Sequence, residues 1–337
     1  MKHRSVLISS LVGCLAGLFV ISGCTPAPNP DPTPTDAVTT PASNAFPATV
    51  QTKFGAVTIP QQPVRIVALG WGDAETVLAL GGQPVAASDW LGFGGEGVGP
   101  WSAGLYKQAP QILGTLELSY EEVAALQPDL ILDVRSSGDE ERYQRLASIA
   151  PTVGVPEGGD AYLTSIEQQV ELISTALGKI AEGEALIEQL NAAFTKTAAD
   201  HQQWKGLTLT AATRTSESWG AYITGSDRVT FLERLGFVQN PEIAALKPNE
   251  GALGFSVSLS SEQISLFDAN LIVAFPIWID TAEITDDPMW KQIPAVKSGH
   301  SVVIDGDLSQ AYSVATVPGN LYALEHLVPL IEQALAK

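Results

Sequence analysis

Arginine and aromatic residues follow several apolar runs of this chain. Arg135 comes directly after the largely apolar segment 130–134, and Arg214 directly after the expected strand 207–213. Guanidinium groups give directed hydrogen bonds to oxygen-rich anions, and aromatic faces bury an apolar skeleton at small entropic cost. Loops carrying both types are therefore suited to bind an anion with apolar parts. The candidates are Trp71, Trp90, Trp101, Arg135, Arg214, Trp219, Tyr222, Arg228, Trp278 and Tyr312.

A repeated unit supplies the elements that must position these residues. Residues 118–134 read LSYEEVAALQPDLILDV, and residues 259–275 read LSSEQISLFDANLIVAF. Each copy begins with a capping box, Ser119 with Glu122 or Ser260 with Gln263, which predicts a short helix. Each ends in an apolar run typical of a strand buried on both faces. The repeat predicts an α/β fold with two similar lobes and a cleft at the carboxyl ends of the strands, where ligands bind.

These candidates also have purely structural interpretations. Any one tryptophan can serve loop packing, and Arg228 can simply occupy the first turn of its helix. The loops themselves are expected at 88–106, 214–227, 276–287 and 305–318. Long loops without secondary structure are more often functional than idle.

Composition and periodicity divide the chain into five segments. Residues 1–23 have a basic start, an apolar centre and a small-residue processing site, and are interpreted as an export signal. Residues 24–45 are rich in Pro and Thr and are interpreted as an extended tether. We expect an N-terminal lobe at 46–161, a helical region with the interlobe helix at 162–204, and a C-terminal lobe at 205–337.

The sequence ISGC at 21–24 resembles the bacterial lipobox, which would make Cys24 the first mature residue and the carrier of a lipid anchor. LVGC at 11–14 matches the same pattern with a shorter apolar region. The alternative is a plain secretory signal with an incidental cysteine. No cysteine follows position 24, so a disulfide framework is not expected.

Charge and missing motifs argue against several function classes. The formal net charge of -19 opposes binding to nucleic acid or anionic lipid headgroups. The sequence has no G-x-S-x-G nucleophile elbow and no glycine-rich nucleotide motif. His3, His201, His300 and His326 are not spaced as ligands of a bare metal ion. We therefore expect a monomeric protein that is not an enzyme and has no resident cofactor or metal.

Six segments, in this order, resemble the helical-backbone substrate-binding proteins of ABC importers for ferric siderophores, haem and cobalamin. They are RIVALGWGDAETVLALG (65–81), LSYEEVAALQPDLIL (118–132), RLASIAPTV (145–153), FLERLGF (231–237), SEQISLFDANLIVAF (261–275) and MWKQIPAVKSGHSVVI (289–304). The resemblance implies two Rossmann-like lobes joined by one long helix. It also implies a ferric siderophore between the lobes and an ABC permease dimer as partner.

The resemblance assigns roles to individual residues. Glu121 and Glu262 match the glutamates that dock onto the permease, although a carboxylate there also suits the helix macrodipole. Arg135 and Arg228 fall where catecholate-binding members place arginines, but no third arginine lies near 277–278. The resemblance therefore favours a hydroxamate or mixed siderophore.

Other ligands and functions of the same architecture remain open. Haem could bind through Tyr222 or Tyr312, cobalamin is a further alternative, and a lipid-anchored sensor is a third. The expected location is the extracytoplasmic face of the cell membrane. The proline-threonine tether resembles those of Gram-positive lipoproteins, which favours the outer surface of a Gram-positive cell, or the periplasm if an outer membrane exists.

Overall fold

The computed structural model describes residues 45–115, 117–159, 161–248 and 254–336. The expected signal sequence, Cys24 and all of the tether before Ala45 lie outside the described residues. The chain from residue 44 onward forms one compact unit. Within the described ranges, no helix combines the length and apolar character needed to cross a membrane.

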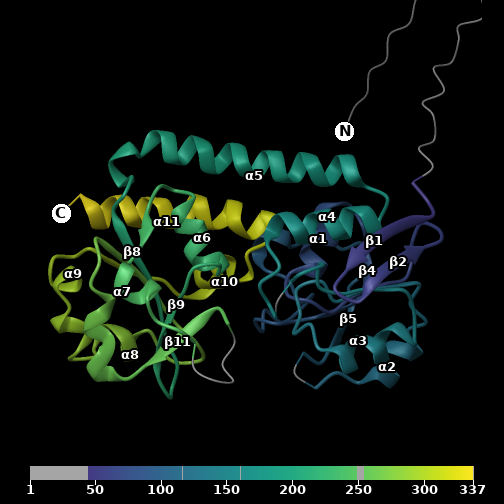
Figure 1. Ribbon diagram of the computed structural model, residues 1–337, viewed down its shortest axis with the longest axis horizontal. Coiled ribbons are helices and arrows are strands. Elements are labelled where there is room, and N and C mark those ends of the chain that lie inside the picture. The colour runs from purple at the N-terminus through teal and green to yellow at the C-terminus, as the bar shows by residue number, and fades with distance from the viewer. Residues whose placement is uncertain (1–44, 116, 160, 249–253, 337) are drawn as a thin grey trace, which may run out of the picture. The chain divides into compact units, whose positions relative to one another are not determined.

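The first lobe is built on a parallel five-stranded sheet (Figure 1). Its strand order is β5 (Gln111–Leu113), β4 (Pro84–Ser88), β3 (Ile66–Ala68), β6 (Leu130–Leu132) and β7 (Thr152–Val153). A separate hairpin is formed by β1 (Ala48–Thr52) and β2 (Gly55–Ile59). The helices of this lobe are α1 (Asp73–Ala79), α2 (Tyr120–Ala125) and α3 (Glu140–Ala147), with a short 3-10 helix η1 (Pro100–Ser102).

The second lobe is built on a six-stranded mixed sheet. Its order is β11 (Ser256–Leu259), β9 (Trp219–Tyr222), β8 (Thr208–Arg214), β12 (Leu271–Pro276) and β13 (Ser301–Val303), with β10 (Val238–Gln239) beside the start of β8. Its helices are α6 (Asp227–Glu233), α7 (Pro241–Ala244), η3 (Ser261–Phe267), α8 (Ala282–Thr285), η4 (Trp290–Gln292), α9 (Pro294–Lys297), α10 (Gly306–Val314) and α11 (Val317–Leu335). Strands β8, β12 and β13 are parallel, so their carboxyl ends share one edge.

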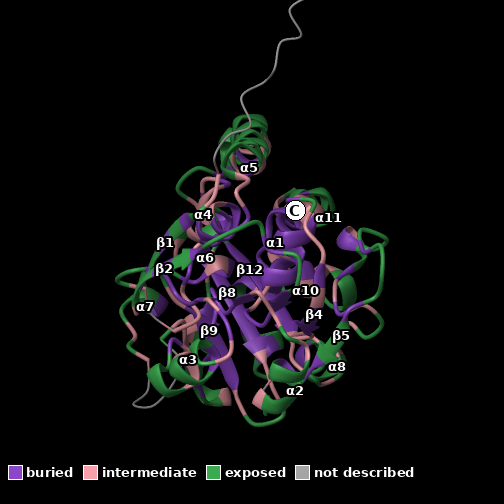
Figure 2. Cartoon of the chain, turned by 90° about the vertical axis from the view of Figure 1, so that its right-hand side faces the viewer, coloured by how far each residue is buried: buried purple, intermediate pink, exposed green. Residues whose placement is uncertain are grey.

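Strand β6 of the first repeat copy and β12 of the second are buried on both faces, as expected. Alternate residues of β12 enter different cores, with Val273 in one cluster and Ile272 in another. Strand β6 divides in the same way, with Leu130 and Ile131 in separate clusters. Figure 2 shows the sheets as buried and α5 as largely exposed. Apolar side chains on both faces of a strand are what helix-covered sheets require.

Three helical segments connect the lobes. They are α4 (Ile166–Ala176), α5 (Ile180–Asp200) and the 3-10 turn η2 (Gln202–Trp204), which leads directly into β8. The 21 residues of α5 span about 32 Å. Helix α5 packs against α4 at one end and runs along α11 of the second lobe (Figure 1). The expectation of two α/β lobes joined by one long helix is confirmed.

Several local expectations were wrong. The loop expected at 214–227 contains strand β9, because Trp219–Tyr222 pairs with β8 and β11. The loop expected at 305–318 is largely α10, and the loop at 276–287 contains α8. The helix of the second repeat copy is a 3-10 helix.

Ser119 caps α2 by accepting from the Glu122 N–H, and the Ser260 N–H donates to Gln263 Oε1 at 3.0 Å.

Candidate ligand-binding site between the lobes

The first lobe meets the second at the carboxyl ends of its parallel strands β3 and β6. Arg135, just beyond β6, donates from Nη1 to the carbonyl oxygens of Val314 and Ala315 in the second lobe, at 3.0 and 3.3 Å. The rings of Trp71 and Phe255 lie 6.2 Å apart across the same interface. Residues after β3 and β6 thus lie at the interface, where open α/β sheets bind ligands. The second lobe contributes the junction of α10 and α11 and the residue before β11.

A small cavity lies within this interface. Its lining residues are Trp71, Tyr162, Leu163, Ser226, Asp227, Arg228, Phe255 and Ser313. Its free volume is about 10 Å³, on the order of a single water molecule. Pockets for organic ligands measure roughly 300–1,000 Å³. A ligand of that size therefore requires the lobes to move apart.

Three residues that line this cavity have buried polar atoms without a hydrogen-bond partner among the described residues. These atoms are Nε1 of Trp71 in the first lobe, and Oγ of Ser226 and Nε of Arg228 in the second. A buried donor left unpaired costs about 1–3 kcal/mol. Acceptor atoms of a ligand would satisfy these groups, so the cavity is suited to an oxygen-rich molecule held by both lobes.

Arg228 stands in the first turn of α6 and is only 8% exposed. Its guanidinium lies over the ring of Tyr222, 4.5 Å from the ring centroid. Nη2 donates to the carbonyl oxygen of Ser313 at 3.2 Å, and the Tyr312 hydroxyl donates to the Arg228 carbonyl. The guanidinium is thus fixed in orientation and removed from water, which strengthens its attraction for an anion.

Arg135 is almost fully used by the protein. It is 1% exposed, and its Nε donates to the carbonyl oxygen of Thr164 at 2.9 Å. Nη1 also lies 3.4 Å from Oδ2 of Asp227, and Nη2 has no partner among the described residues. Burial raises the pKa of Asp227, while Arg135 and Arg228 oppose that shift. Arg135 therefore joins the lobes and keeps one free donor group.

Asp73 connects the residues that carry the site in the first lobe. Its Oδ2 accepts from the N–H groups of Gly70 and Val134, and its Oδ1 accepts from Gln169 Nε2 at 2.6 Å. Gln169 also donates to the carbonyl oxygen of Trp71. Burial raises the pKa of Asp73 to about 6 despite these hydrogen bonds. Asp73 therefore positions Trp71 and Arg135.

Glu75 on α1 forms a second buried link between the lobes. It accepts from the indole Nε1 of Trp101 at 2.8 Å and from Oγ1 of Thr316, the residue that caps α11. Burial raises the pKa of Glu75. The Trp101 ring also packs against Tyr322 of α11, with centroids 5.2 Å apart. Trp101 therefore lies in the interface but away from the residues that line the cavity.

The other candidates take varied positions. Trp90 packs against Trp71 and donates to the carbonyl oxygen of Leu69, and Tyr312 is buried beneath Arg228. Trp219 stacks on Trp290 in the core of the second lobe. Arg214 donates to the carbonyl oxygen of Thr215, and Trp278 is 91% exposed. Arg214, Trp219 and Trp278 are not among the residues that line the cavity.

Sequence reasoning missed six of the lining residues. Asp227 and Ser226 immediately precede the candidate Arg228, and Tyr162 and Phe255 are aromatic residues outside regular structure. Asp227 could have been predicted as a site residue from the sequence only because it is adjacent to Arg228. Leu163 and Ser313 carry no signal in residue type or spacing.

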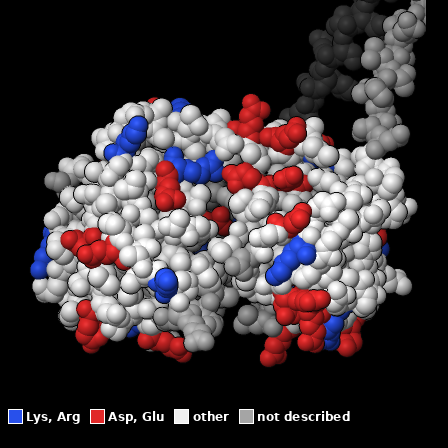
Figure 3. All heavy atoms as spheres, viewed as in Figure 1, with Lys and Arg blue, Asp and Glu red and all other residues white. Residues whose placement is uncertain are grey.

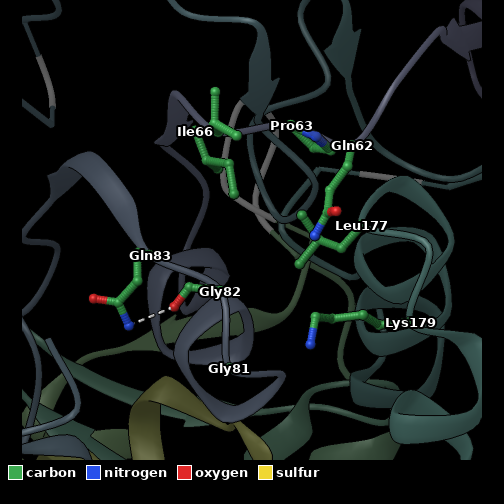
Figure 4. A pocket seen from close by; sticks show the side chains of 9 residues that line it. Gln62, Pro63, Ile66, Gly81, Gly82, Gln83, Leu177 and Lys179 are labelled. Carbon is green, nitrogen blue, oxygen red and sulfur yellow. Dashed lines mark hydrogen bonds between the residues drawn. The ribbon is translucent and has the colours of Figure 1, made fainter. Parts of the chain in front are cut away.

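A different pocket lies at the amino ends of β3 and β4, opposite the strand ends that meet the second lobe (Figure 4). It measures about 250 Å³ and is lined by Gln62, Pro63, Val64, Ile66, Gly81, Gly82, Gln83, Leu177 and Lys179. The side chain of Gln83 donates to the carbonyl oxygen of Gly82. No lining residue has a buried polar atom without a partner. The interlobe cavity is therefore the stronger candidate.

Glu121 and Glu262 are both exposed, each in the first turn of its helix. Ser119 Oγ lies 3.4 Å from Glu121 Oε2. Hydrogen bonds from its own backbone N–H and from Ser260 lower the pKa of Glu262. Both carboxylates remain accessible to a partner. Figure 3 shows acidic side chains along the lower edge of both lobes.

No group of three or more His, Cys, Asp or Glu side chains suited to hold a metal ion occurs within the described ranges.

Comparison with known proteins identifies the family. A relative from Bacillus subtilis, named "Probable siderophore-binding lipoprotein YfiY", is 28% identical over 83% of this chain and 84% of its own length. The Fe(3+) dicitrate-binding periplasmic protein FecB of Escherichia coli is 25% identical over 79% of this chain and 84% of its own.

Solved structures agree on the fold. A periplasmic solute binding protein from Mycobacterium smegmatis has a TM-score of 0.75 and 27% identity, covering 86% of this chain and 98% of its own. The family model described as "Periplasmic binding protein" matches residues 66–308, which include both sheets from β3 to β13. The expectation of a solute-binding protein rather than an enzyme is thereby confirmed, and the chain belongs to the periplasmic binding protein family.

Proposed function

We propose that this chain is the receptor of an ABC importer and binds a ferric siderophore between its lobes. The observation that carries the proposal is the set of unpaired buried donors on Trp71, Ser226 and Arg228 around one interlobe cavity. Siderophore complexes present oxygen acceptors on an apolar skeleton, which suits these donors and the surrounding rings. The names of two relatives, a siderophore-binding lipoprotein and a ferric dicitrate-binding protein, support this ligand class.

Within that class, the site favours a hydroxamate or mixed siderophore over a tris-catecholate. Arg228 lines the cavity, and Arg135 is largely occupied by backbone carbonyls. Residues 277–278 contribute no arginine. Few free cationic donors suit a ferric complex of low negative charge.

Haem is the weaker alternative. An iron–tyrosine bond requires a phenolate. Burial raises the pKa of Tyr312, whose hydroxyl already donates to the Arg228 carbonyl. Tyr222 is buried between Phe255 and Phe275, beneath Arg228. Both environments oppose iron coordination by these residues.

The proposal extends to the membrane side of the protein. Cys24 carries the lipid that holds the receptor at the extracytoplasmic face of the cell membrane. Glu121 and Glu262 dock onto the two subunits of the permease. The exposed position of both glutamates and the lipoprotein names of relatives support this arrangement.

Fluorescence titration tests the ligand. Trp71 and Trp90 lie at the interface, so a bound ferric complex should quench tryptophan emission at sub-micromolar concentration. The ligands are a ferric trihydroxamate, ferric dicitrate, a ferric tris-catecholate, haem and cobalamin. Arg228→Gln should weaken binding of the ferric siderophore by roughly 10- to 100-fold, the loss expected for a hydrogen bond to a charged group. No response to any of the five ligands would refute the proposal.

A further inference from the structure

An acidic residue lies among the arginines of the site. Asp227 opens α6 and lines the interlobe cavity beside Arg228. Its Oδ2 lies 3.4 Å from Nη1 of Arg135, and its side chain is 21% exposed, against 1% for Arg135. A carboxylate at this position acts against the capture of an anion, so its presence calls for a functional reason.

The ion pair between Asp227 and Arg135 is loose. Nη1 of Arg135 already donates to the carbonyl oxygens of Val314 and Ala315, and Nε donates to Thr164. The separation of 3.4 Å exceeds that of a close charge-assisted hydrogen bond, about 2.7–2.9 Å. The carboxylate of this lining residue therefore keeps acceptor capacity.

The carboxylate also changes the charge that a ligand meets. Arg135 and Arg228 contribute two positive charges, and the ionised form of Asp227 cancels one of them. In a site removed from water, one unit of charge within a few ångströms of a charged ligand changes the affinity for that ligand on the order of tenfold or more. A site with little net positive charge holds polyanions poorly.

We propose that Asp227 determines which ferric complexes the site accepts. It disfavours polyanionic complexes by charge, and it accepts a hydrogen bond from a donor on the ligand, such as a hydroxyl, an amide N–H or an ammonium group. This inference rests on the proposed function and makes it more specific. The preferred ligand is a neutral or cationic ferric complex with a donor group outside the iron centre.

The structural alternative is that Asp227 serves only the fold. A carboxylate at the start of a helix is favourable to the macrodipole, and a cross-lobe ion pair holds the lobes together. In that case its removal would weaken binding of every ligand by a similar factor. The dependence on ligand charge separates the two explanations.

The test compares the full-length protein with Asp227→Asn, Asp227→Ser and Glu188→Gln. Asp227→Asn keeps the side-chain shape, and Asp227→Ser keeps a small polar residue at the first position of α6. Glu188→Gln makes the same change in net charge at an exposed position on α5. Dissociation constants are measured for a neutral ferric trihydroxamate and a trianionic ferric tris-catecholate. A further pair is a trihydroxamate with a free ammonium group and its N-acetylated form.

We expect the wild type to prefer the neutral complex, and the ammonium form over the acetylated form. Both Asp227 variants should raise the ratio of tris-catecholate to trihydroxamate affinity by on the order of tenfold. They should also remove the preference for the ammonium form, while Glu188→Gln leaves both ratios unchanged. Two results would overturn this inference and leave the proposed function standing. One is a wild type that prefers the trianionic complex, and the other is a change in affinity by the same factor for all ligands in both Asp227 variants. Failure of the wild type to bind any complex would overturn the proposed function as well.

Discussion

Asp73 shows how one buried carboxylate organises the first-lobe half of the site. It accepts from Val134, the residue before Arg135, and from Gln169, which also holds the Trp71 carbonyl. The two candidate ligand-binding residues of this lobe, Trp71 and Arg135, are thereby fixed relative to each other. Burial raises the Asp73 pKa, so this arrangement carries a dependence on pH.

The stability of the protein should increase as the pH falls from 7 to 5. The pKa of Asp73 rises from 3.8 to about 6 on folding, so the folded state binds a proton that the unfolded chain lacks between these values. For this group alone the gain from pH 7 to pH 5 is about 1.3 kcal/mol in the free energy of unfolding. Glu75 and His201 also have raised pKa values and act in the same direction.

Urea denaturation at pH 7 and pH 5 measures the increase in the free energy of unfolding. The same measurement on Asp73→Asn shows how much of this increase comes from Asp73. The variant should lose about 1.3 kcal/mol of the increase. An equal increase in both proteins would show that another group is responsible.

The strand-end rule predicted some site residues and misplaced others. Trp71 and Arg135 follow parallel strands of the first lobe, and the structure brings both to the interface. Arg228 also lines the cavity, but it begins α6 after the antiparallel strand β9. Trp219 was expected in a loop, but the register of β9 turns its side chain into the core against Trp290. Residue type alone does not reveal such a register.

At the scale of elements, the start of α1 faces the start of α11 across the interface. Gly72 precedes α1 with φ of +73°, and a Cβ at this position would lie 2.4 Å from Cγ2 of Thr316. Thr316 caps α11 through the N–H of Gly319. The absence of a side chain at position 72 therefore allows these two helices to approach closely.

Gly72→Ala should hold the lobes apart and strengthen binding of the ferric complex by up to roughly tenfold, because the form that admits a ligand becomes more populated. Gly81→Ala is a matched control, since Gly81 has the same φ and its nearest neighbour would be Lys179 Nζ at 3.7 Å. Both variants should lose about 1 kcal/mol of stability through the left-handed backbone. Only Gly72→Ala should show a larger radius of gyration in X-ray scattering with ligand present. Equal affinities of the two variants would contradict this expectation.

The repeat predicted the main elements because capping residues and buried strands leave strong sequence patterns. The expected buried strands and the 21-residue helix α5 are present. Helix α10 was missed because Gly306, Asp307 and Ser309 have the composition of a loop, and its packing against α11 decides its conformation. Strand β9 depends on pairing with β8 and β11, which a local sequence pattern does not contain.

At the scale of the whole molecule, the proposed function includes a lipid anchor at Cys24 and docking of Glu121 and Glu262 onto a permease. Replacing both Glu121 and Glu262 by Lys should abolish uptake of radiolabelled iron by cells and leave the affinity for the ferric complex unchanged, since both side chains are exposed. Glu184→Lys with Glu188→Lys on α5 makes the same charge change at exposed positions and should retain uptake.

Cys24→Ala in the same assay should move the receptor from the membrane fraction to the soluble fraction. Loss of ligand affinity in the Glu121 and Glu262 variant would assign these carboxylates to the fold instead. Continued membrane association of Cys24→Ala would leave the alternative of an uncleaved or different anchor.

The tight interlobe cavity also has a kinetic meaning. A volume of about 10 Å³ admits no organic ligand, so every binding event waits for the lobes to separate. Domain motions of this kind take microseconds to milliseconds. The opening rate is then a ceiling on the rate of loading, however abundant the ligand becomes. The same ceiling applies to release, which requires Arg135 to leave the carbonyl groups of Val314 and Ala315.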